Sequence, residues 1–293
     1  MRAIGVVNHI YVYPGQNSFL KKIEYTDLKT MMIQEKDILK HSRASWNRQS
    51  REGSEWCTPV DADAIAEAKN GSWEVILTPL KTVPKSWFGE ITNRDILCLA
   101  SGGGQQAPIL AAAGASIVSF DNSDEQLKKD KMVADQHSLP LKTLQGDMAD
   151  LSVFNDHSFD LIFHPVSNVF VHDVKKVWQE CFRVLRPGGS LLSGIMNPLY
   201  FLFDHDESEK TKILKVKYKQ PYSDLKNLDD EKKRDLINQK ISFEFGHSLD
   251  DQIGGQIEAG FVITGFYEDW WSDEATGLNQ FTPTFFSTRA TKL

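Results

Sequence analysis

The chain has 293 residues, of which 41% are hydrophobic and 25% are charged, and its formal net charge is −7 at pH 7. This length suits one elaborated domain with a substantial core, and the composition is that of an ordinary globular protein. The acidic balance argues against non-specific binding of nucleic acid, which requires clustered lysine and arginine. No apolar run approaches the ~18 residues of a membrane span. From the charge and the apolar runs together, we expect neither a nucleic-acid partner nor a membrane.

The three cysteines, Cys57, Cys98 and Cys181, are scattered without the spacing of a metal site. Such usage indicates a reducing compartment and predicts no bound metal. The first residues contain a short apolar stretch that is broken by Asn8 and His9 and carries no cleavage signal. We therefore expect a cytoplasmic protein.

Residues 1–90 are interpreted as a leader followed by a helical lid segment. Residues 1–30 carry no helical period, which suggests a loosely attached leader or a misassigned start codon. The pattern becomes helical from Ile33 to Leu39 and again from Asp61 to Asn70. Asp61 is suited to cap the second of these helices.

The stretch from Asp95 to Asp121 combines a strand, a glycine turn, a helix and a second strand. The apolar run Ile96–Leu99 breaks at the glycines Gly102–Gly104, and an alanine-rich segment then leads to Gly114. Glycines let the backbone approach a ligand closely, and a helix N-terminus offers free N–H groups to an anion. A carboxylate about 20 residues downstream is placed to accept ribose hydroxyls. The pattern predicts a site for a nucleoside-containing cofactor.

The same glycines do not identify which nucleoside-containing cofactor is bound. The spacing Gly102-x-Gly104-x-x-Ala107, followed by Asp121, also satisfies the dinucleotide fingerprint of NAD enzymes. The turn alone therefore does not separate the two cofactor classes, and the remaining elements must decide.

Strands and helices alternate through the central region. We predict a helix from the capping box Ser123–Gln126 to about His137, strands over 141–145, 159–163 and 190–196, and a helix that begins after Asp173 and ends at Arg186–Gly189. Alternation of this kind is typical of a parallel sheet with right-handed crossovers.

The alternation of strands and helices stops over residues 199–247, which are charged, aromatic and irregular. We interpret these residues as an insertion. A helix over about 249–259 follows, with Gly260 as its cap, and then two strands over 261–267 and 284–290. NAD folds usually close with another parallel repeat. The predicted terminal hairpin on the sheet edge therefore favours a different cofactor.

Five motifs in this order resemble those of class I S-adenosylmethionine-dependent methyltransferases, particularly the small-molecule group related to ubiquinone/menaquinone-biosynthesis methyltransferases. The motifs are Ile96–Gly104, Val118–Asp121, Gly146-Asp147-Met148, Phe159–Phe163 and Arg186-Pro187-Gly188-Gly189 with the following strand. The motifs span residues 94–198, and residues 249–291 match by pattern.

The resemblance implies an α/β fold with a Rossmann-like sheet of seven strands. The sheet would be mostly parallel, with a C-terminal antiparallel hairpin and helices on both faces. Residues 91–293 would form the methyltransferase domain, interrupted by the insertion 199–247.

The resemblance also implies S-adenosylmethionine as the cofactor and a set of residues that would bind it. These are Ala100, Ser101, Gly102, Gly103, Gly104, Asp121, Asn122, Gln126, Gly146, Asp147, Met148 and His164. The turn 100–104 would pass its backbone beneath the methionine part of the cofactor.

Within this set, the resemblance assigns individual roles. Asp121 would accept hydrogen bonds from both ribose hydroxyls, and Asn122 would flank the adenine. Asp147 would meet the adenine amino group, and Met148 would pack on the ring. The backbone around His164 would lie beside the sulfonium, at the strand tip where open α/β sheets bind ligands.

The chain departs from the family at two positions. Cys98 stands where an acidic residue is usual, and Ala100 stands where a glycine is usual. Loss of the acid removes a partner for the cofactor's amino group, so that Gln105 or Gln106 would have to substitute.

Methyl transfer needs donor and acceptor to be aligned and water to be excluded. A general base is required only when the acceptor must lose a proton, so no universal catalytic residue is expected. The candidates are His164, at the end of the fourth predicted strand, and Asn168. His172 is interpreted as a surface residue and His247 as a packed histidine.

The sequence therefore predicts a methyltransferase that acts on a small molecule, with segment 31–90 and the insertion 199–247 closing over the substrate as a lid. Two alternatives stay open. One is an NAD-dependent oxidoreductase. The other is a non-catalytic protein that binds or senses S-adenosylmethionine, prompted by the missing acid at Cys98 and the lack of an obvious base. The pattern identifies neither the acceptor nor the oligomeric state.

Overall fold

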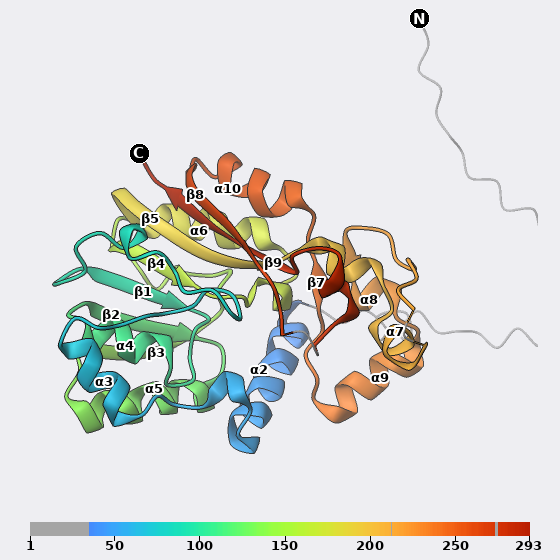
Figure 1. The fold of residues 1–293 in the computed structure, drawn as a ribbon, viewed down its shortest axis with the longest axis horizontal. Coiled ribbons are helices and arrows are strands. Elements are labelled where there is room, and N and C mark those ends of the chain that lie inside the picture. The colour runs from blue at the N-terminus through green and yellow to red at the C-terminus, as the bar shows by residue number, and fades with distance from the viewer. Residues whose placement is uncertain (1–34, 212, 273–274) are drawn as a thin grey trace, which may run out of the picture. The chain divides into compact units, whose positions relative to one another are not determined.

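A seven-stranded sheet with the order β3-β2-β1-β4-β5-β9-β8 forms the centre of the structure (Figure 1). The computed structural model describes residues 35–211, 213–272 and 275–293, so the predicted leader over residues 1–30 lies outside the described residues. The strands of this sheet are Asp95–Leu99 (β1), Ser116–Asp121 (β2), Leu141–Gln145 (β3), Phe159–His164 (β4), Leu185–Met196 (β5), Val262–Asp269 (β8) and Phe285–Thr291 (β9). Tyr222–Ser223 (β6) and Phe245–Gly246 (β7) pair separately.

Strand direction confirms the predicted fold class. β1 pairs in parallel with β2 and β4, β2 with β3, and β4 with β5. β9 runs antiparallel to both of its neighbours, β5 and β8. The predicted C-terminal hairpin is therefore present, with β9 inside the sheet and β8 at its edge.

Helices cover both faces of the sheet (Figure 1). They are Glu35–Glu52 (α2), Ala62–Lys69 (α3), Gln106–Ala112 (α4), Asp124–His137 (α5), Val174–Val184 (α6), His205–Thr211 (α7), Asp224–Asn227 (α8), Asp230–Gln239 (α9) and Gly255–Glu258 (α10). Buried residues of α3, α4 and α5 pack together on one face, and α6 packs on the other. Among the described residues, no helix is long and apolar enough to cross a membrane.

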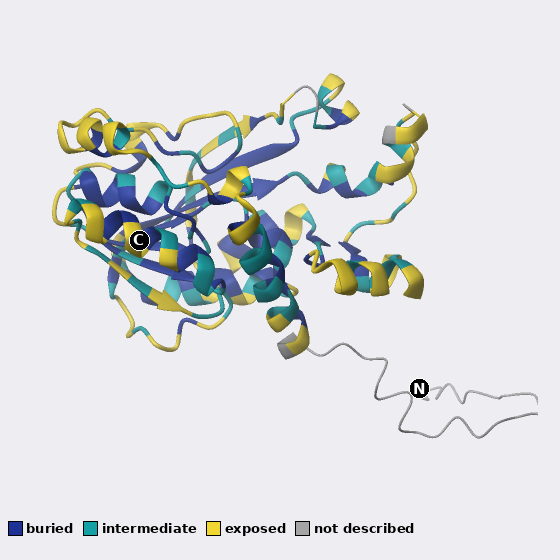
Figure 2. Ribbon diagram, turned by 90° about the horizontal axis from the view of Figure 1, so that it is seen from below, coloured by how far each residue is buried: buried dark blue, intermediate teal, exposed yellow. Residues whose placement is uncertain are grey.

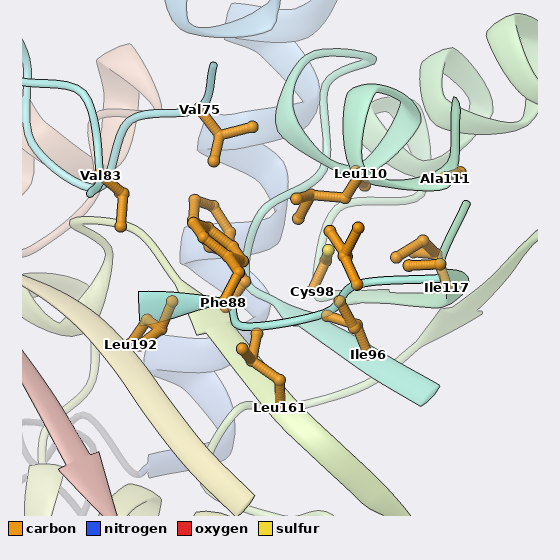
Figure 3. Close-up of a cluster of buried hydrophobic side chains, with 14 of the residues drawn as sticks. Val75, Val83, Phe88, Ile96, Cys98, Leu110, Ala111, Ile117, Leu161 and Leu192 are labelled. Atoms are coloured by element: carbon orange, nitrogen blue, oxygen red, sulfur yellow. The ribbon is translucent and has the colours of Figure 1, made fainter. Parts of the chain in front are cut away.

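The central strands are buried on both faces, which explains their continuous apolar runs. In β1, Ile96 and Cys98 belong to a core beneath α4 and the segment 75–91 (Figure 3). Leu97 and Leu99 belong to the core beneath α6. Successive side chains of a strand point to opposite faces, so one short strand supplies both cores.

The insertion 199–247 packs onto the end of the sheet. Phe201 and Tyr222 from the insertion share a buried cluster with Met196 at the end of β5 and Phe285 at the start of β9. By contrast, α9 buries no residue, in keeping with its mixed charges. In Figure 2 the central strands of the sheet are mostly dark blue, whereas much of the insertion's helices is yellow.

The first described helix is longer than predicted. The sequence predicts a helix over 33–39, whereas α2 continues to Glu52, just before Gly53 in the left-handed region. Its buried face contains Ser42, Ser45 and Ser50. Because serines instead of large apolar residues pack there, the apolar period that marks an amphipathic helix is missing.

The fifth parallel strand begins earlier than predicted. The sequence places Arg186–Gly189 at the end of a helix, but the helix stops at Val184 and these residues already belong to β5. The register with β4 shifts between Leu185 and Ser190, which marks a bulge. The backbone of Gly188 and Gly189 pairs with Lys292 beyond β9. The Pro-Gly-Gly motif therefore bends a strand.

The predicted helix over 249–259 is also divided. Residues Asp250–Gly254 form a π-helical turn, and only Gly255–Glu258 form α10. Two adjacent glycines weaken a regular α-helix at this point. Gly260 has the positive φ expected of the residue that ends the helix.

Candidate cofactor and acceptor site

A cavity of about 370 Å³ lies at the carboxyl ends of the parallel strands. The turn after β1 contributes Ala100–Gly102, and β2 ends at the cavity with Asp121 and Asn122. Asp147 and Met148 follow β3, and Pro165–Ser167 follow β4. Because parallel strands end at one edge of the sheet, four separate motifs meet around one space.

Asp121 is fixed by the backbone at the end of β2. Its Oδ2 accepts a hydrogen bond from the Gly102 N–H (3.0 Å), and its Oδ1 accepts one from the Ser123 N–H (2.8 Å). Burial raises the pKa of Asp121 above its ordinary value, while these N–H donors act in the opposite direction. A Cβ at Gly102 would lie 2.9 Å from Gln126 Cβ, so only glycine lets the turn approach this closely.

Asp130 on α5 holds the glycine turn from behind. Its Oδ1 accepts a 2.6 Å hydrogen bond from the Gly104 N–H, and its Oδ2 accepts one of 2.6 Å from Ser119 Oγ. The side chain is fully buried, and burial raises the pKa of Asp130 to about 7. Gly103 and Gly104 have positive φ and do not line the cavity. Gly103 and Gly104, which were predicted to bind the cofactor, therefore shape the turn. The role of Asp130 in holding this turn was not predicted.

Gly146 also stands apart from the other predicted cofactor residues. It does not line the cavity, and a Cβ there would lie 2.0 Å from Phe120 Cζ. Its N–H donates to the Asp121 carbonyl oxygen (3.0 Å). Gly146 therefore makes room for the Phe120 ring and fixes the chain before Asp147 and Met148.

The structure does not bring the two catalytic candidates to the cavity. His164 and Asn168 are fully buried, and neither is a lining residue. His164 Nδ1 donates to the Leu99 carbonyl oxygen (3.0 Å), and burial lowers the pKa of this histidine to about 4. Asn168 Nδ2 lies 3.4 Å from Gln252 Oε1. The side chain of β4's last residue points into the core, and the residues after it reach the cavity.

The other two histidines differ from each other. His172 is exposed, as predicted, and also lines the cavity. His247 is packed, as predicted, because its Nε2 lies 3.1 Å from the Asn168 carbonyl oxygen and 3.0 Å from that of Val171.

The far wall of the cavity comes from residues outside the predicted cofactor-binding and catalytic sets. They include Ser42 and Trp46 of α2, Phe170, Met196, Ser242, Glu244, Trp271 and Phe285. The Trp46 and Phe170 rings pack edge to face with centroids 5.2 Å apart. Both predicted lid segments therefore contribute to the wall, but no motif marked the individual side chains.

Asn122 ties α2 to the end of β2. Arg43 Nε donates to Asn122 Oδ1 (3.1 Å), and Asn122 Nδ2 donates to the Leu39 carbonyl oxygen (2.9 Å). Asn47 Nδ2 adds a 2.7 Å hydrogen bond to Asp124 Oδ1. The helix is thus held over the cavity by side chains that flank the predicted adenine site.

The cavity's composition fits S-adenosylmethionine. Asp121 offers a carboxylate to hydroxyls, Met148 offers an apolar surface to a ring, and Gly102 leaves space beside the turn. Ser101 Oγ is buried in the same wall, and no group in the described part of the chain hydrogen-bonds to it. A buried hydroxyl of this kind is satisfied when a polar ligand binds.

Comparison with known proteins gives the family. A model described as a methyltransferase domain matches residues 97–193. A protein of Bacillus subtilis (strain 168), named uncharacterized methyltransferase YbaJ, is 48% identical over 256 residues, which cover 87% of this chain and 99% of that protein. The chain belongs to the class I S-adenosylmethionine-dependent methyltransferases. The methyltransferase is therefore an enzyme that uses S-adenosylmethionine, which decides between the two cofactors left open above.

Solved structures agree on the fold. A putative S-adenosylmethionine-dependent methyltransferase from Listeria monocytogenes aligns with a TM-score of 0.57 at 15% identity, over 71% of this chain and 94% of its own. An S-adenosylmethionine-dependent methyltransferase from Mesorhizobium loti aligns with a TM-score of 0.54 at 17% identity, over 70% of this chain and 94% of its own. At these identities the likeness concerns the Rossmann-like sheet of the methyltransferase and not its acceptor.

Proposed function

We propose that this methyltransferase binds S-adenosylmethionine across the carboxyl ends of β1 to β4 and methylates a small molecule held in the same cavity. The observation that carries the proposal is the position of Asp121. Its buried carboxylate is locked by two backbone N–H groups and lines a cavity that continues to an aromatic wall. Donor and acceptor would therefore share one enclosed space.

Each lining residue has a task in this proposal. Asp121 holds the ribose hydroxyls, Asp147 and Met148 hold the adenine, and the turn Ala100–Gly102 holds the methionine part. The bound cofactor supplies a methyl group that its sulfonium activates. The protein then has to align the acceptor and exclude water, and the apolar side chains of Trp46 and its neighbours provide the exclusion.

The charge of the chain supports a small-molecule acceptor in place of nucleic acid. The net charge is −7, and no lysine or arginine occurs among the described residues that line the cavity. A phosphate backbone would find no counter-charge there. The three cysteines are free and buried, which supports the cytoplasm as the compartment of this methyltransferase.

Calorimetric titration with S-adenosylhomocysteine tests the proposal. We expect micromolar binding to the wild type and a loss of at least ~10-fold in Asp121→Ala, because hydrogen bonds to a charged group contribute about 1.5–3 kcal/mol. Asp135→Ala is the matched control, since Asp135 pairs with Lys131 on the exposed side of α5. Its affinity should equal that of the wild type.

NADH serves as the competing ligand, and we expect no binding. Thermal unfolding of each variant checks that Asp121→Ala is folded at the titration temperature. Binding of NADH without binding of S-adenosylhomocysteine would overturn the proposed site. If a folded Asp121→Ala variant bound S-adenosylhomocysteine as tightly as the wild type, Asp121 would not be the residue that binds the ribose.

A further inference from the structure

Carboxylates from the cofactor motifs and from the insertion line the cavity. Three carboxylates line it, namely Asp121, Asp147 and Glu244, and the lining that the structure describes includes no lysine or arginine. The first two lie on the side assigned to the cofactor. Glu244 comes from the insertion, on the side left for the acceptor. An anionic acceptor would therefore meet a carboxylate without a compensating cation.

The backbone holds Glu244 in place. Its N–H donates to Asp224 Oδ2 (2.7 Å), and its carbonyl oxygen accepts from the Asp224 N–H (3.0 Å). The next residue, Phe245, pairs with Ser223 in the small β6–β7 sheet. Tyr222 Oη donates to the remaining Asp224 oxygen, Oδ1 (2.7 Å). Both carboxylate oxygens of Asp224 therefore accept hydrogen bonds that hold the backbone of residue 244 in place. The Glu244 side chain takes no part in these hydrogen bonds.

The Glu244 carboxylate has no hydrogen bond or ion pair with any residue that the structure describes. Burial, together with the nearby Asp224 charge, raises the pKa of Glu244 to about 7. Ser242, two residues earlier, lines the same cavity; its side chain is nine-tenths buried, and its Oγ has no partner in the described chain. A buried hydroxyl without a partner, such as Ser242 Oγ, costs free energy, and a polar group of a ligand in the cavity would satisfy it.

Aromatic and apolar side chains line the same cavity as this carboxylate. Trp46 packs against Phe170, and the Trp271 and Phe285 rings pack with centroids 5.2 Å apart. All four line the cavity. Aromatic faces accommodate an apolar body and attract a nearby cation. The acceptor end therefore combines an apolar enclosure with one unpaired carboxylate.

We propose that the methyl acceptor is an amine with an apolar body, and that Glu244 binds its N–H group and receives its proton. This inference rests on the function proposed above, since it fills the part of the cavity left for the acceptor. In the reaction, the nitrogen lone pair forms a bond to the methyl carbon while the carbon–sulfur bond breaks and its electron pair stays on sulfur. The positive charge moves to nitrogen, and the N–H proton passes to the Glu244 carboxylate.

Three matched probes test the inference: 2-phenylethylamine, 2-phenylethanol and 3-phenylpropanoate, each titrated into the protein saturated with S-adenosylhomocysteine. We expect the amine to bind the wild type at least ten-fold more tightly than the alcohol, and the carboxylate to bind least. Glu244→Gln, which keeps the shape and removes the charge, should abolish the preference for the amine. Glu231→Gln, on the exposed side of α9, should keep it.

Thermal unfolding separates a structural role from a binding role. Glu244→Gln removes a half-buried charge that is repelled by Asp224, so the variant should unfold at no lower temperature than the wild type. No preference of the wild type for the amine, including no binding of any probe, would overturn the inference. A preference retained in Glu244→Gln would also overturn it. Failure of S-adenosylhomocysteine to bind is seen first in the same titration, and it would overturn the proposed function together with this inference.

Discussion

At the end of β2, Asp121 builds the site as well as lining it. Its two oxygens fix the turn at Gly102 and the cap of α5 at Ser123, so one side chain joins two motifs. The sequence could predict this residue because it follows an apolar run at a fixed distance from the glycines. It could not predict Asp130, whose hydrogen bonds to Gly104 and Ser119 exist only once α5 packs on the sheet.

Gly146 offers a prediction at the scale of one residue. Gly146→Ala would place a Cβ 2.0 Å from Phe120 Cζ, and we expect a loss of ~2 kcal/mol in the free energy of unfolding, as is usual for overpacking. Urea denaturation measures this loss. Gly277→Ala is the control, since among the described residues no heavy atom beyond its chain neighbours lies within 4 Å of a Cβ there, and it should change little.

A second variant identifies the cause of that loss. If the Phe120 ring is responsible, Gly146→Ala should cost clearly less in a Phe120→Leu background than in the wild type. The same cost in both backgrounds would show that the backbone, and not the ring, requires glycine at this position.

The candidate catalytic residues show where residue patterns stop being informative. His164 ends a strand at the expected edge, but the alternation of side chains turns it inward, next to Trp178. Glu244 and Trp46 line the cavity because distant segments fold over it. No local spacing records that arrangement, so the acceptor wall could not be predicted.

Among the elements, the glycine turn and α5 depend on each other through Asp130. Burial raises the pKa of Asp130 to about 7, whereas an unfolded aspartate has an ordinary pKa near 4. Between these two values the folded protein binds a proton that the unfolded chain does not. Stability therefore falls as the pH rises through this range and levels off above about 7.

Asp130→Asn tests this coupling. The amide oxygen still accepts from the Gly104 N–H, and the amide nitrogen donates to Ser119 Oγ in place of accepting from it, as a protonated carboxyl would, but the amide cannot titrate. Between pH 5.5 and 7.5 we expect the wild type to lose about 2 kcal/mol more unfolding free energy than the variant, by urea denaturation at both pH values. Equal pH responses of the two proteins would show that Asp130 is not protonated in the folded state.

The elements that the sequence predicted well are those with strong periods. β1, β2 and β4 follow apolar runs, and α6 carries a wide apolar face with Val177, Trp178 and Cys181 buried. The errors fall where packing overrides pattern. Serines form the buried face of α2, and the glycines before Ser190 make a bulge in β5 in place of a helix end.

Across the whole molecule, two segments far apart in sequence close one cavity. Ser45 Oγ of α2 accepts from the Ser242 N–H (3.1 Å), and the His41 and Phe243 rings lie 5.0 Å apart. α2 and the end of the insertion thus contact each other above the carboxyl edge of the sheet. Such an enclosure suits a reaction in which water must be kept from the acceptor.

A crystal structure of the complex with S-adenosylhomocysteine would show directly where the cofactor binds and which part of the cavity stays free. We expect ribose oxygens within hydrogen-bond distance of the Asp121 carboxylate, the adenine against Met148, and the space between Glu244 and the aromatic wall left open for the acceptor. Binding of S-adenosylhomocysteine away from Asp121, or across the Glu244 wall, would contradict this expectation.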